Sequence, residues 1–211
     1  MRNDKMLEML NKGQIEELKV LLQDEIYTES LKKKPDAKKR YSAMKKYFSY
    51  RTTSMEALQK PCVVEFEGRK YISFTNSYSL ALTTEDCGEI KLFEYPERYP
   101  NVTRLIKLEG IPKKLDFGKV IAEAKSKGYK LKKAEVDYGY KYLMHYDGAY
   151  FKIGLLDATF GIIDDGKEAT VYHEENSNSP LYIENTIGAA LVLPVRLKDD
   201  EVPYGVTVVD A

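Results

Sequence analysis

The hydrophobic period changes repeatedly over the last third of the chain, and these changes constrain the fold more than any other feature. Short apolar runs typical of strands flank one longer apolar run that suits a buried helix. In chain order the runs are 150–153 (strand), 155–163 (helix), 169–173, 181–184 and 189–197 (strands). A strand, a helix and three further strands form a compact α+β unit. We therefore predict an α+β fold.

The pattern of apolar residues in the first third of the chain predicts helices. Apolar residues recur at three- and four-residue steps over 3–27, with a break at residues 11–13 where Gly13 is costly inside a helix. A second helix is predicted to begin at Pro35. Its apolar face would comprise Tyr41, Met44, Tyr47 and Phe48.

The middle of the chain predicts a hairpin, a boundary and a further unit. Strands over 62–66 and 70–75 would flank a Gly68 turn. Residues 83–101 are poor in apolar residues and contain two prolines, which places a boundary near residue 100. We predict a segment over 1–100, with helices and a small strand region, and a domain over 101–211. The latter would open with a strand (102–108), a helix (116–127) and two strands (134–139 and 141–146).

Composition indicates a globular chain. With 211 residues and 43% hydrophobic residues, the chain can bury a core without disulfides or metals. The two cysteines, Cys62 and Cys87, fit no metal spacing and are interpreted as a reduced pair. The N-terminus is too polar for a signal peptide, and no apolar run is long enough for a membrane span. A cytoplasmic location without membrane contact is expected.

The charge is segregated, although 33 basic and 33 acidic residues give a net charge of zero. Residues 31–51 carry nine basic residues and one acidic residue; residues 110–133 carry eight and two. Residues 147–211 carry four basic and twelve acidic residues. A solvated lysine face is the alternative, but two basic runs in a neutral protein, each on a helix, favour binding to nucleic acid. The candidate DNA-binding residues are Lys38, Lys39, Arg40, Lys45, Lys119, Lys125, Lys127 and Lys130.

No catalytic or cofactor motif stands out. Residues 161–167 imitate the start of a phosphate-binding loop, but Glu168 follows where a Ser or Thr is needed. His145 and His173 lie at strand ends without ligand spacing, so we interpret both as structural. The sequence predicts no enzyme, no metal and no cofactor.

Three short motifs resemble one family. The closing Leu191-Val-Leu-Pro-Val-Arg-Leu197, the turn Thr75–Ala81 with its Thr, Leu and Ala, and the stretch Tyr99–Leu105 are similar to parts of bacterial DNA sliding clamps, the DNA polymerase III β-subunit family. The resemblance implies a divergent, shortened clamp-like fold with duplicated β-α-β-β-β halves over the C-terminal part. It also implies a non-enzymatic role in DNA replication or repair.

The resemblance implies a peptide site as well. In the family the closing segment helps to line an apolar groove for peptides of replication proteins. Here the groove would be lined by Thr75, Tyr78, Leu80, Val192, Leu193, Pro194, Val195 and Arg196. The tail beyond Leu197 contains an apolar stretch, Val206–Val209, that we expect to pair with a strand or to cover apolar surface beside Pro194. To surround a duplex, so short a chain would need to form a homo-oligomer through its sheet edges.

Two other functions stay open. The chain could be a protein-binding adaptor of phage or mobile-element origin that does not bind DNA. It could also be an α+β enzyme whose site is not visible in the sequence. Salt-dependent DNA binding would exclude the adaptor, which does not bind DNA. A deep pocket with converging polar groups would favour the enzyme.

Overall fold

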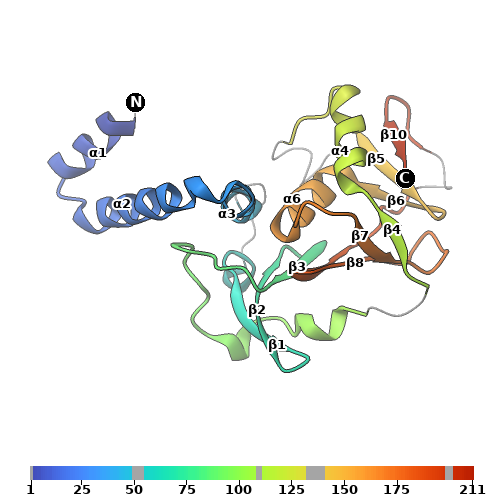
Figure 1. Cartoon of the computed structure of the whole chain (residues 1–211), viewed down its shortest axis with the longest axis horizontal. Coiled ribbons are helices and arrows are strands. Elements are labelled where there is room, and N and C mark those ends of the chain that lie inside the picture. The colour runs from blue at the N-terminus through green and yellow to red at the C-terminus, as the bar shows by residue number, and fades with distance from the viewer. Residues whose placement is uncertain (1, 49–54, 108–110, 132–140, 198–201) are drawn as a thin grey trace.

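The computed structural model describes residues 2–48, 55–107, 111–131, 141–197 and 202–211, and shows a mixed α+β fold (Figure 1). A seven-stranded antiparallel sheet has the strand order β1-β2-β3-β9-β8-β7-β4. These strands are β1 (Cys62–Phe66), β2 (Arg69–Thr75), β3 (Ser79–Thr83), β4 (Lys113–Leu115), β7 (Ala169–Tyr172), β8 (Leu181–Asn185) and β9 (Gly188–Val192). A smaller sheet contains β10 (Thr207–Asp210), β5 (Tyr142–Tyr146) and β6 (Ala149–Lys152).

The predicted N-terminal helices are confirmed. Helices α1 (Arg2–Asn11) and α2 (Ile15–Ser30) are separated at Gly13, which has a positive φ of 71°. They project from the body as an arm (Figure 1). A short 3₁₀ helix, η1 (Leu31–Lys33), leads into α3 (Pro35–Tyr47), which begins at the predicted proline. Tyr41, Met44 and Tyr47 on its apolar face are buried as predicted.

Helix α6 (Ile153–Ile163) lies at the centre of the molecule between α3 and the sheets (Figure 1). Nine of its eleven residues are buried. It approaches α3 closely, because a Cβ added at Gly161 would lie only 3.1 Å from the Cβ of Ala43. The main core cluster around α6 includes Phe74, Phe117 and Ile183.

The two faces of the large sheet contact different parts of the chain. Strand residues alternate, so Ala81 and Ala190 face the main core while Leu80 and Leu82 face a second apolar cluster. That second cluster also holds residues of the 84–107 segment, such as Phe93 and Tyr99. The segment contains two 3₁₀ helices, η4 (Pro96–Arg98) and η5 (Val102–Leu105). The later part of the segment, from Phe93 to Ile106, therefore covers the sheet face opposite α6, whereas Cys87 belongs to the main core.

The helix predicted over 116–127 is confirmed as α4 (Phe117–Ser126). Asp116 caps it by accepting a hydrogen bond from the Lys119 N–H at 3.0 Å, and Gly128 follows its end with a φ of +95°. Helix α4 packs beside α6, as expected, with the Phe117 and Phe160 rings 4.7 Å apart.

The C-terminal tail pairs with a strand, as predicted. Strand β10 runs parallel to β5, so that Val209 is opposite Met144 and fully buried. Lys127 donates a hydrogen bond from Nζ to the Val208 carbonyl at 3.1 Å, which also holds the tail against α4. The described part of the tail, residues 202–211, thus lies on the smaller sheet and contributes no residue to the cavity that holds Tyr78.

Several sequence predictions are wrong or only partly right. The strand predicted over 102–108 is wrong: η5 occupies this position and directs Val102 and Ile106 into the second cluster. The last strand ends at Val192 instead of residue 197, since Pro194 has no N–H for a ladder. The strand predicted over 134–139 lies outside the described residues. The order β6-α6-β7-β8-β9 matches the second predicted half, but a clamp-like duplication is not confirmed.

The large sheet crosses the predicted boundary near residue 100. Strand β3 pairs with β9 over Ser79–Thr83 and Gly188–Val192, so strands from before and after the boundary share one ladder. None of the helices that the structure describes has the length and apolar composition that crossing a membrane requires.

A candidate lysine-lined groove between helices α3 and α6

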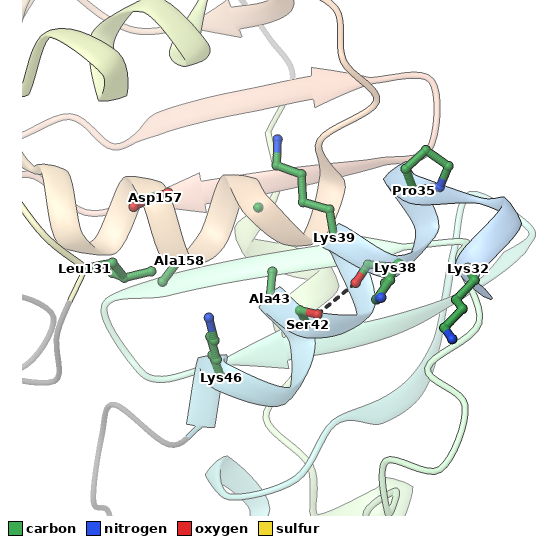
Figure 2. A pocket seen from close by; sticks show the side chains of 11 residues that line it. Lys32, Pro35, Lys38, Lys39, Ser42, Ala43, Lys46, Leu131, Asp157 and Ala158 are labelled. Atoms are coloured by element: carbon green, nitrogen blue, oxygen red, sulfur yellow. Dashed lines mark hydrogen bonds between the residues drawn. The ribbon is translucent and has the colours of Figure 1, made fainter. Parts of the chain in front are cut away.

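A groove of about 600 Å³ lies between α3 and α6 (Figure 2). The lining residues of α3 recur at the spacing of one helix face, so its lysines and small residues point into the same groove. The groove is lined by Lys32, Pro35, Lys38, Lys39, Ser42, Ala43, Lys46, Leu131, Asp157, Ala158 and Gly161. Its floor is apolar and its walls carry four lysines.

The groove is also where α6 reaches solvent. Asp157 and Gly161 are the two residues of α6 that are not buried, and both line the groove. Figure 2 shows Lys39 and Lys46 extending from α3 toward α6, with Ala43 between them. Lys39 forms an ion pair with Asp164, just beyond the end of α6, at 2.6 Å.

Asp157 gives the groove its electrostatic character. Burial raises the pKa of Asp157 above its ordinary value, against the opposing charges of Lys125, Lys39 and Lys46. Tyr129 donates a hydrogen bond from its hydroxyl to Asp157 Oδ2 at 3.1 Å. Lys125 belongs to the second basic run and the other two lysines to the first. The two runs therefore meet around Asp157, which is the arrangement that a shared binding surface requires.

The other predicted DNA-binding residues have other contacts. Arg40 is largely buried and forms an ion pair with Glu85 at 2.8 Å. Lys45 pairs with Asp24 at 2.6 Å. Lys119 pairs with Asp116 at 3.2 Å and Lys127 with Glu123 at 2.7 Å. Lys130 lies on the exposed surface just after α4.

Four of the eight predicted groove residues do meet, at a second cavity of about 400 Å³. Thr75, Tyr78, Leu80 and Leu193 line it together. Its remaining lining residues were not among the predicted ones: they are Ser77, Ser79, Arg104, Leu105, Lys107, Pro180, Tyr182 and Leu191.

A tight turn presents Tyr78 at this cavity. Asn76 Oδ1 accepts hydrogen bonds from the backbone N–H groups of Tyr78 and Ser79 at 3.1 and 2.9 Å. Ser77, between Asn76 and Tyr78, has a positive φ of 71°. The Leu193 N–H donates to the Tyr78 carbonyl at 2.9 Å, so the turn and the end of β9 are joined.

The other four predicted groove residues lie elsewhere. Val192 is fully buried in the main core and Pro194 is half-buried. Val195 and Arg196 line a third, more polar cavity of about 530 Å³ with His145 and Tyr150. In this third cavity His145 Nδ1 lies 3.2 Å from Asp210 Oδ1.

Asp157, Lys32 and Lys46 are charged residues of the lysine-lined groove that were not among the predicted site residues. Asp157 is the most informative of them. The signal that could have found it is its position as the single charged residue in the apolar run Ile153–Ile163. Among the residues that the structure describes, no group of three His, Cys, Asp or Glu side chains could hold a metal ion.

The chain was compared with family models, with curated proteins and with solved structures, and none of them matches.

Proposed function

We propose that this protein binds double-stranded DNA without acting on it chemically, and that the lysine-lined groove contacts the phosphate backbone. The observation that supports the proposal is the convergence of both basic runs on Asp157: Lys39 and Lys46 of the first run and Lys125 of the second act on this carboxylate, and Lys32 and Lys38 also line the groove. Lysine contacts to phosphates position a protein on a duplex without reading its sequence. A role in replication or repair follows only from the resemblance to sliding clamps.

Salt dependence tests this proposal. Four lysine–phosphate contacts should give a slope of about −3.5 in a plot of log affinity against log salt concentration. The double variant Lys38→Gln/Lys46→Gln should reduce the slope by about 2, since each neutralised phosphate contributes about 0.9. Lys91→Gln is the matched control, because Lys91 is exposed, lies outside the groove and pairs with Glu94.

Two results would contradict the proposal. One is the absence of duplex binding at low salt. The other is a slope that the double variant leaves unchanged, which would place the phosphate contacts outside the groove. Random-sequence and fixed-sequence duplexes should bind alike, because the groove lysines would contact only the backbone.

A second candidate function rests on the Tyr78 cavity. Tyr78, Leu105 and Leu193 are large exposed apolar residues there, and Arg104 and Lys107 add positive charge. This combination suits a peptide with apolar and acidic side chains. Tyr78→Ala should weaken binding of such a peptide at least about tenfold, as expected for an aromatic anchor. Tyr95→Ala, at an exposed tyrosine outside the cavity, should have no effect.

A further inference from the structure

The N-terminal arm exposes an apolar stripe. Ile15, Leu22 and Ile26 lie seven and four positions apart on α2, which places them on one face of the helix. They expose 56%, 42% and 70% of their surface. No residue of α2 is buried. An exposed apolar stripe on a projecting helix is a typical feature of an interaction surface.

The opposite face of α2 fixes the arm to the body. Asp24 accepts a hydrogen bond from the Tyr41 hydroxyl at 2.6 Å. Tyr27 donates one to Asp86 at 3.2 Å, and its ring lies against Gly88, where an added Cβ would approach the ring to 2.4 Å. These contacts hold the stripe away from the body of its own chain.

The charge of α2 determines which surface suits the stripe. Helix α2 carries five acidic residues against Lys19, a net charge of −4. Two α2 helices packed against each other would bring these like charges together, which is unfavourable. A basic surface with an apolar floor is the complementary partner. The groove between α3 and α6 has this character: Pro35, Ala43 and Ala158 line its floor beside four lysines, whereas the Tyr78 cavity has two basic residues, Arg104 and Lys107.

The arm cannot enter the groove of its own chain. Only four residues, Leu31–Lys34, connect α2 to α3, and the contacts of Asp24 and Tyr27 fix the direction of the arm. A second copy of the chain has no such restriction.

We propose that α2 of one copy docks into the α3–α6 groove of a second copy, and the reverse, to form a twofold dimer. Ile15, Leu22 and Ile26 would contact the apolar floor. Glu25 and Glu29 lie three positions after Leu22 and Ile26, so they border the stripe and would face the lysines. A helix that lays an apolar face into a groove is a common recognition mode. The dimer uses the groove that the proposed function assigns to DNA. Self-association and duplex binding therefore compete.

Sedimentation equilibrium of the full chain across a wide concentration range tests the dimer. The wild-type chain should associate reversibly to a dimer. Leu22→Asp/Ile26→Asp should weaken association at least about tenfold, because charges would enter an apolar contact. Val20→Asp is the matched control: Val20 is 55% exposed on the same helix but lies off the stripe, so association should be unchanged.

A groove variant identifies what the arm binds. Lys38→Glu/Lys46→Glu should also be monomeric, although its arm is intact. Mixing it with the Leu22→Asp/Ile26→Asp variant should restore a heterodimer through the one intact arm and the one intact groove. A groove variant that dimerises like wild type would overturn the proposal, because the arm would then bind elsewhere. A wild-type chain that is monomeric at every concentration would overturn it too.

Duplex titrations separate this inference from the proposed function. The arm variant should bind DNA more tightly than wild type at concentrations where wild type is dimeric, because its groove is free. If no variant binds DNA while the association results hold, the dimer stands and the DNA-binding proposal falls. If wild type binds DNA with the expected salt slope and stays monomeric, the DNA-binding proposal stands and the dimer falls.

Discussion

At the scale of single residues, Gly188 is a position where the fold leaves no space for a side chain. A Cβ there would lie 2.0 Å from the Leu82 carbonyl oxygen and 3.1 Å from Ile163 Cγ2. Because the nearest atom is backbone in the paired strand β3, it cannot rotate away. Gly188→Ala should therefore lower the free energy of unfolding by about 3 kcal/mol, at the upper end of overpacking costs. Urea denaturation measures this change.

Gly148 provides the control for that substitution. It has a φ of +77° in the turn between β5 and β6, and no atom lies within 4 Å of an added Cβ. Gly148→Ala should cost about 1 kcal/mol, from the left-handed backbone alone. Equal costs at the two glycines would contradict the close approach of β9 to β3.

Asp157 makes stability depend on pH in a defined direction. Burial raises its pKa in the folded protein above the unfolded value of 3.8, so the folded state binds more protons in the window above pH 3.8. The free energy of unfolding should fall as pH rises through that window. Asp157→Asn should remove this decrease and make the protein more stable than wild type at neutral pH, since Tyr129 can donate to the amide oxygen as well.

Asp165 should behave in the opposite way. Despite its partial burial, hydrogen bonds from Thr186 and from the Lys167 N–H hold the pKa of Asp165 below its ordinary value. Its contribution to stability is present above the unfolded pKa and is lost as pH falls through the folded pKa. Asp165→Asn should then destabilise the protein at neutral pH. Urea denaturation of both variants from mildly acidic to neutral pH gives the two signs.

At the scale of elements, the tail strand β10 contributes to stability through Val209. Its side chain is fully buried in the main core, whereas Val208 is only half-buried. Val209→Ala should lower the free energy of unfolding by about 2 kcal/mol, as large-to-small core substitutions do. Val208→Ala should cost less than about 1 kcal/mol. If both substitutions have the same small effect, β10 does not pack as the structure has it.

Local sequence patterns predicted most of the helices and strands, but they could not predict which distant strands pair. Pro35 and Gly128 mark helix ends through backbone chemistry that acts within a few residues, so both ends were predictable. The pairing of β3 with β9 joins residues more than a hundred positions apart, and no local pattern encodes it. The 3₁₀ helix at Val102 was mistaken for a strand because its apolar residues suit either structure until the opposing cluster is known.

The candidate site follows the same division. The lysines of α3 were recognisable as a basic run, and two of the residues predicted to bind DNA, Arg40 and Lys45, form ion pairs with Glu85 and Asp24. Their partners lie 45 and 21 residues away, so charge counting along the chain could not identify them. Asp157 lines the groove because the other faces of α6 are buried in the core, and a local pattern does not show which face of the helix stays accessible.

At the scale of the whole molecule, the shared sheet predicts a single cooperative unit. Strand β3 is buried along its whole length between β2 and β9, and α6 packs on both β3 and β9. A fragment comprising residues 101–211 would leave β9 as a bare edge and uncover α6. We expect that fragment to be unfolded or aggregated, because an apolar edge strand is prone to intermolecular pairing.

The full chain should correspondingly unfold in one calorimetric transition, with the calorimetric enthalpy equal to the van't Hoff enthalpy. Circular dichroism and tyrosine fluorescence should give the same midpoint, since the tyrosines are spread over both halves. A soluble 101–211 fragment with its own cooperative transition would instead support the boundary near residue 100 that the composition suggests. Two separate transitions in the full chain would support it as well, and the pairing of β3 with β9 would then be a docking contact between two units.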